Sequence, residues 1–143
     1  MLLVHGWGEW AANLGAFIAP LRAAGYRVVG FDLPAHGGSS GVQTDGLLNA
    51  AAVREAAAEV GGVHAVIAHS MGAHAVTLAL RDGLYADRVV LLAPAVRLEH
   101  GVAAFKQMFG LTDRAVEGLR ATIESRYGST VWSDLAADEL ARE

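Results

Sequence analysis

The sequence contains no cysteine, which excludes disulfide bonds, thiolate catalysis and cysteine-based metal sites. It also lacks a basic cluster, and a net charge of -4 over 143 residues does not favour a nucleic-acid interface. The apolar runs are short and interrupted by glycine, arginine or aspartate, so no stretch of about 20 residues could cross a bilayer. The N-terminal residues show no basic region followed by a cleavage site. We therefore expect a cytoplasmic protein without a membrane span.

Two kinds of ligand site are missing as well. Histidines and carboxylates form no H-E-x-x-H motif or comparable ligand set, so we assign no metal. The glycine-rich segments at residues 6–8 and 37–41 have neither the P-loop pattern nor the dinucleotide-binding spacing. We expect no cofactor.

The composition that remains is that of a globular protein. Hydrophobic residues make up 53% of the chain, and its length is that of one domain. A chain of this size can bury roughly two thirds of the surface that its unfolded form exposes. Disorder is therefore poorly supported.

Apolar runs alternate with helical patterns over the first two thirds of the chain. Helices are expected from Glu9 to Ala24, from Thr44 (as N-cap) to about Val60, and from Met71 to Arg81. Four buried strands separated by such helices imply right-handed crossovers. The prediction is an α/β fold, a parallel sheet of about four strands in three layers with helices on both faces. The strands are expected at Leu2 to Val4, Tyr26 to Phe31, Val63 to Ala68 and Arg88 to Ala93.

The pattern changes after Pro94. Residues 95–143 contain no convincing strand and predict three helices, at about 98–109, 112–126 and 133–142. We divide the chain into a sheet-containing core, residues 1–94, and a helical segment, residues 95–143, that covers the strand ends as a lid or completes one face of the sheet.

One serine stands at a turn between a strand and a helix. The stretch from Ala65 to Val76 reads as an apolar run, small residues around Ser70, and a helical pattern. A serine at such a turn stands at the carboxyl end of a strand, beside the backbone N–H groups that begin the next helix. That is a suitable place for a nucleophile. The alternative is a serine that is merely tolerated in a turn.

Three loops together resemble motifs of the α/β-hydrolase family. VHGWG at residues 4–8 looks like the H-G-x loop, and FDLPAHGGS at residues 31–39 looks like the D-x-P-G-H-G-x-S loop, with Ala35 in place of one glycine. AHSMG at residues 68–72 looks like the nucleophile elbow G-x-S-x-G, with Ala68 at the first glycine. The resemblance covers roughly Leu2 to Pro94, and the helices that follow resemble the start of a cap or lid.

The resemblance implies a role for each matching residue. Ser70 would be the nucleophile that attacks a carbonyl carbon to form an acyl-enzyme. The backbone N–H groups of Met71 and Trp7 would form the oxyanion hole. The remaining matching residues would support these loops (His5, Gly6, Gly72) or line the pocket (His69).

The base and the acid of a triad are harder to place. Of the six histidines, His100, next to Glu99, is the one that position does not explain, although a solvated histidine at the start of a lid helix is the simpler interpretation. In the family both groups follow later strands, and the chain ends at Glu143. The sequence thus resembles the middle of a hydrolase domain, without either flank.

Two functional hypotheses follow. The first is a serine hydrolase acting on a carboxylic ester, or a related small acyl substrate, through an acyl-enzyme on Ser70. The second is a truncated, non-catalytic fragment that keeps the elbow but lacks the acid and base. Uncovered sheet edges would then favour self-association.

Overall fold

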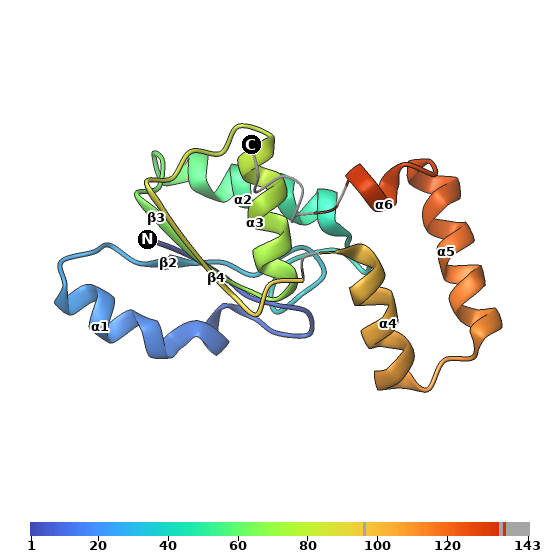
Figure 1. Ribbon diagram of the computed structural model, residues 1–143. Helices are drawn as coiled ribbons and strands as arrows, with labels where there is room; N and C mark the ends of the chain where they lie inside the picture. The colour runs from blue at the N-terminus through green and yellow to red at the C-terminus, as the bar shows by residue number, and fades with distance from the viewer. Residues whose placement is uncertain (96, 135, 137–143) are drawn as a thin grey trace. The chain divides into compact units, whose positions relative to one another are not determined.

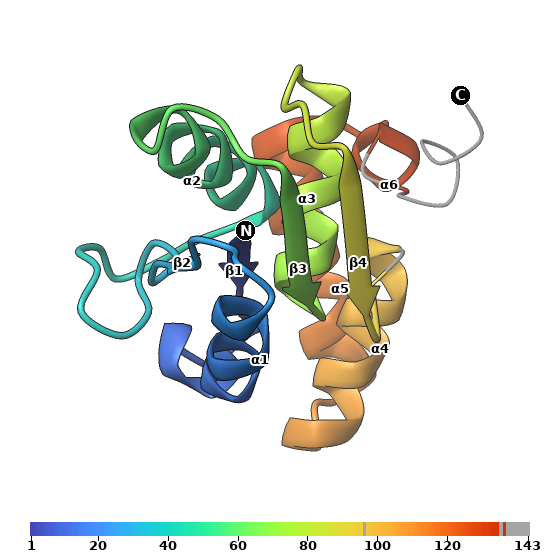
Figure 2. The ribbon, with the colours of Figure 1, turned by 90° about the vertical axis from the view of Figure 1, so that its left-hand side faces the viewer.

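The computed structural model describes residues 1–95, 97–134 and 136, and the chain forms two compact units, Met1–Pro94 and Ala95–Glu143. The first unit is built on a four-stranded parallel sheet with the order β2-β1-β3-β4. Because β1 and β3 are adjacent, parallel, central strands, the loops that follow them start side by side at the carboxyl ends of the strands (Figure 2). The strands are β1 (Leu2–Val4), β2 (Val29–Gly30), β3 (Ala65–His69) and β4 (Arg88–Leu92).

Helices cover both faces of this sheet, as the alternation of strands and helices predicts. Helices α2 (Gly46–Glu59) and α3 (Met71–Arg81) pack against each other on one face (Figure 1). The 3-10 helix η1 (Ala11–Phe17) and helix α1 (Ile18–Ala23) lie on the other. There Leu14 packs with the buried Leu3 and Ile67 of the sheet. The predicted three-layer α/β class is therefore confirmed.

Some predicted boundaries are wrong, for local reasons. The strand expected from Tyr26 to Phe31 is reduced to Val29–Gly30, because it pairs only with two residues of β1. The single helix expected from Glu9 begins instead as a 3-10 helix at Ala11 and becomes an α-helix at Ile18. Helix α2 is capped not by Thr44 but by Asp45, whose Oδ1 accepts hydrogen bonds from two backbone N–H groups of the first turn.

The second unit contains α4 (Leu98–Phe109), α5 (Asp113–Tyr127) and α6 (Val131–Asp134). The Thr112 hydroxyl caps α5 by accepting from the N–H of Ala115 at 3.2 Å. The indole of Trp132 donates to Glu124 at 2.7 Å and lies under the guanidinium of Arg120, 4.0 Å from the ring centre, so α5 and α6 are held together. Most of the helix expected at 133–142 falls outside the described residues.

Among the residues that the structure describes, no helix is both long enough and apolar enough to serve as a transmembrane span.

Candidate active site

Ser70 occupies a strained backbone conformation between β3 and α3. Its φ of 50° and ψ of -115° are unusual for a residue with a side chain, and such a conformation costs about 1–3 kcal/mol. Neighbouring strands hold it in place, since the Ser70 N–H donates to the carbonyl of Leu92, at the end of β4, over 2.9 Å. Strain maintained by surrounding contacts is typical of functional turns. The turn has the geometry expected of a nucleophile elbow.

Gly72 allows α3 to begin directly against the loop that follows β1. A Cβ atom on Gly72 would overlap the carbonyl oxygen of His5 and would lie 2.8 Å from that of Val4. Only glycine fits this contact without moving backbone. The elbow and the loop from His5 to Gly8 are therefore packed backbone to backbone.

His5 connects this loop to the next one. Its ring is fully buried, and its Nε2 lies 2.9 Å from the backbone N of Leu33. Because that N–H can only donate, Nε2 is the acceptor and the ring proton is on Nδ1, which donates to the carbonyl of Gly6 at 2.8 Å. The sequence prediction gives His5 a loop-supporting role, and these two hydrogen bonds are of the kind that such a role requires.

Asp32 organises the loop after β2. Its carboxylate accepts hydrogen bonds from the backbone N–H groups of Ala11, at 2.7 Å, and Gly38, at 2.8 Å. The hydrogen bond from Ala11 is the largest cause that lowers the pKa of Asp32 from its ordinary 3.8, and the one from Gly38 is the next. A side chain on Gly37, which has a φ of 52°, would collide with this carboxylate.

Replacing Asp32 with asparagine is expected to remove a pH-dependent part of the stability. Because the pKa is lower in the folded protein than in the unfolded chain, this stabilisation is complete above about pH 4 and is lost as the pH falls through the folded pKa. At neutral pH the variant should lose about 1.5–3 kcal/mol of unfolding free energy, the range for hydrogen bonds to a charged group. Urea unfolding at neutral and acid pH measures both effects.

The exposed Glu59, at the end of α2, provides a matched control, since Glu59→Gln removes a carboxylate that makes no such loop contacts. Parallel stability curves for wild type and Asp32→Asn across the acid range would contradict the assignment.

Glu9 also belongs to this region, although the sequence interpretation did not single it out. Its Oε2 accepts a hydrogen bond from the Gly6 N–H at 2.7 Å and lies 3.1 Å from Nδ1 of His69. The signal available in the sequence was an acidic residue directly after the H-G-x loop. Its partner His69 is 60 residues away along the chain, which local patterns do not reveal.

The predicted site residues of the first unit converge. A Cβ placed on Gly6 would lie 3.0 Å from Nδ1 of His69 and 3.2 Å from Cβ of Ser70. Met71 is the first residue of α3, where a backbone N–H has no acceptor within its own helix. The half-exposed Trp7 packs edge-on against His36, with ring centres 5.4 Å apart.

Glu99 and His100 belong to the second unit. They lie in the first turn of α4, and their roles as acid and base stay predictions.

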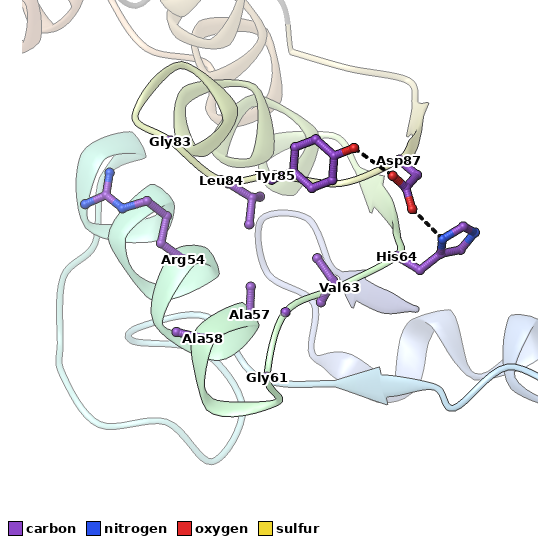
Figure 3. A pocket seen from close by; sticks show the side chains of 11 residues that line it. Arg54, Ala57, Ala58, Gly61, Val63, His64, Gly83, Leu84, Tyr85 and Asp87 are labelled. Atoms are coloured by element: carbon purple, nitrogen blue, oxygen red, sulfur yellow. Dashed lines mark hydrogen bonds and ion pairs between the residues drawn. The ribbon is translucent and has the colours of Figure 1, made fainter.

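An open cavity lies away from Ser70. It has a volume of about 570 Å³ and lies between the C-terminal ends of α2 and α3, near the start of β3 and β4 (Figure 3). Asp87 there pairs with His64 at 2.7 Å and accepts from the Tyr85 hydroxyl at 2.9 Å. Since the strands are parallel, this cavity lies at the amino ends of the strands, whereas Ser70 lies at their carboxyl ends. In the described part of the chain, no three His, Asp or Glu side chains gather as metal ligands would.

Comparison with known proteins agrees with this geometry. The model of the "Alpha/beta hydrolase family" matches residues 1–142. The chain belongs to the alpha/beta hydrolase family. A search of curated proteins found no match. Among solved structures, a monoacylglycerol lipase from Paleococcus ferrophilus is 29% identical with a TM-score of 0.61, and the match covers 78% of this chain and 46% of the lipase.

A second solved structure, an alpha/beta hydrolase fold protein from Burkholderia ambifaria, is 25% identical with a TM-score of 0.59, over 85% of this chain and 49% of that one. An extracellular alpha/beta-hydrolase from a Paenibacillus species, 17% identical with a TM-score of 0.59 over 65% of this chain and 39% of that one, shares the fold. The chain thus spans less than half the length of these three hydrolases.

Two alanines, Ala35 and Ala68, stand where the family motifs have glycine, and their backbone conformations differ. Ala35 has a φ of 61°, a left-handed conformation that costs a residue with a side chain about 1–2 kcal/mol. Ala68 is fully buried and is not among the residues with positive φ, so a methyl group is compatible with its backbone. The turn before Ser70 therefore accepts alanine without backbone strain at position 68, whereas the loop after β2 is strained at Ala35.

Proposed function

We propose that this alpha/beta hydrolase cleaves carboxylic esters through an acyl-enzyme formed on Ser70. The hydroxyl would attack the ester carbonyl, and the alcohol would leave as the acyl bond to Ser70 forms. Water would then attack the acyl-enzyme, releasing the acid and restoring the serine. The strained conformation of Ser70 at the end of β3 is the observation that carries the proposal.

The oxyanion hole would be formed by the N–H groups of Met71 and Trp7. Trp7 follows Gly6, on which a Cβ atom would lie 3.2 Å from Cβ of Ser70. The N–H of Met71 is at the start of α3, where the helix dipole favours a developing negative charge. In the proposed geometry His69 lines the pocket.

The choice of ester rests on similarity. The lipase from Paleococcus ferrophilus acts, by its name, on monoacylglycerols, which are neutral carboxylic esters. The ionised Glu9 near Ser70 also disfavours an anionic acyl group, because like charges at short range repel. A small neutral ester is therefore the first substrate to test.

The second candidate is a non-catalytic chain that keeps the elbow without an acid and a base. The chain spans only 39% to 49% of the three hydrolases described above, so the activity of these 143 residues by themselves has to be tested. Glu99 and His100 are the residues that we propose as acid and base if the chain is active. Loss of turnover in His100→Ala with unchanged folding would support that role.

Hydrolysis of 4-nitrophenyl acetate and 4-nitrophenyl butyrate tests the two candidates directly. The first predicts saturable release of nitrophenolate by folded protein, lost after heat denaturation. The second predicts rates equal to those of the denatured sample. Fully folded protein with no saturable turnover of either ester would overturn the esterase proposal.

Two further expectations accompany the proposal. The edge strands of the sheet are β2 and β4, and Val90 and Leu91 of β4 are exposed. Self-association through these edges is therefore a proposal, and analytical ultracentrifugation would test it by finding dimers.

A cytoplasmic location likewise stays a prediction, which cell fractionation would test.

A further inference from the structure

Glu9 links the loop after β1 to the elbow. Its Oε2 accepts from the Gly6 N–H at 2.7 Å and contacts Nδ1 of His69 at 3.1 Å, and its Oε1 is also 3.1 Å from that nitrogen. His69 is the last residue of β3, immediately before Ser70. One carboxylate thus joins the two segments that carry the proposed nucleophile and one of its proposed oxyanion donors.

The protonation states at this junction follow from its hydrogen bonds. Burial alone would raise the pKa of Glu9, but the hydrogen bonds from Gly6 and His69, with the nearby His69 and His5 rings, lower it below 4.5. Glu9 is therefore a carboxylate at neutral pH and acts only as an acceptor. Nδ1 of His69 must then carry a proton, because a carboxylate has none to donate.

We propose that Glu9 is a positioning residue that holds the loop after β1 against the elbow and fixes the ring tautomer of His69. The role in catalysis rests on the proposed function, while the contact itself does not. The Gly6 backbone lies against Ser70, since a Cβ on Gly6 would be 3.2 Å from Cβ of Ser70. A shift of the Gly6 peptide would therefore move the neighbouring Trp7 N–H relative to the nucleophile.

Positioning, rather than stability, is the effect to expect from this contact. The side chains of Glu9 and His69 are 26% and 35% exposed, and ion pairs with that much solvent contribute little to folding. A displacement of about 1 Å in a catalytic group can reduce a rate by up to about 100-fold. Glu9→Gln should thus change the rate much more than the stability.

Heteronuclear NMR of the full chain tests the contact without any substrate. The Gly6 amide signal should shift with pH as a single carboxyl group titrates below pH 4.5, and this step should vanish in Glu9→Gln. In the wild type the ring nitrogens of His69 should show the proton on Nδ1, and this preference should be lost in the variant. The exposed Glu55 of α2 supplies the control, since Glu55→Gln should alter neither signal.

Ester turnover tests the catalytic part. Glu9→Gln should lower kcat about 10- to 100-fold with KM within about twofold, and Glu9→Asp should recover part of the loss. A Gly6 amide that does not titrate, or that titrates equally in Glu9→Gln, would overturn the contact. An unchanged kcat in Glu9→Gln would overturn the positioning role. If wild-type protein shows the amide titration but no turnover, the proposed function fails and the catalytic role fails with it, while the contact stands.

Discussion

Gly72→Ala is expected to destabilise the first unit severely. The new methyl group would overlap the carbonyl oxygen of His5 and approach that of Val4, both backbone atoms of the loop after β1. Overpacking against side chains costs about 1–3 kcal/mol, and a clash with backbone in a buried contact exceeds that range. A loss of at least about 3 kcal/mol is a large fraction of the stability of a typical domain. Circular dichroism and thermal unfolding would measure it.

Gly118→Ala is the matched control for this substitution. Gly118 lies inside α5, where an added Cβ would meet nothing within 4 Å. Alanine is a better helix former than glycine, so this variant should gain about 0.5–1 kcal/mol. If Gly72→Ala unfolds at the wild-type temperature, α3 does not begin against His5 as described.

Ser70→Ala should abolish ester hydrolysis while leaving the fold intact. The variant keeps the hydrogen bond from its N–H to Leu92 and keeps the positive φ, so its unfolding should match that of the wild type. Loss of the nucleophile of a serine hydrolase removes at least about 10³-fold of kcat, because the acyl-enzyme cannot form. Turnover of 4-nitrophenyl acetate, measured beside the unfolding curve, separates the chemistry from the fold.

The exposed Ser40, in the loop after β2, provides the control for this second prediction. Ser40→Ala should retain wild-type turnover. Activity in Ser70→Ala comparable to that of Ser40→Ala would assign the hydrolysis to another group.

The parts of the fold that depend on long local patterns could be predicted from the sequence. Helix α3 runs from Met71 to Arg81 and α4 from Leu98 to Phe109, as their apolar spacing predicts. The strand expected from Tyr26 to Phe31 is longer than the observed β2. The length of β2 is set by its partner strand, because only Leu2 and Leu3 of β1 pair with it. Strand pairing of this kind is a tertiary effect that local propensity does not contain.

The candidate site likewise contains residues that the sequence could predict and residues that only the structure reveals. Motif residues such as Ser70 and Gly72 could be found from their spacing, and the structure adds the strain of one and the close packing of the other. Glu9 was not found because its role depends on a contact with His69, 60 residues away along the chain. Asp32 was recognised as part of a loop motif, but its hydrogen bond from Ala11, 21 residues away, could not be predicted. A carboxylate is unremarkable in a sequence until its hydrogen-bond donors are known.

Covalent labelling of the folded chain by a fluorophosphonate, followed by mass spectrometry of its peptides, tests the central claim most directly. The reagent phosphonylates an activated serine, so the claim that Ser70 is a nucleophile predicts one adduct per chain, on the peptide that contains Ser70. Ser70→Ala and heat-denatured protein should remain unlabelled. Folded wild-type protein that gains no adduct, or that gains it on a different serine, would contradict the claim.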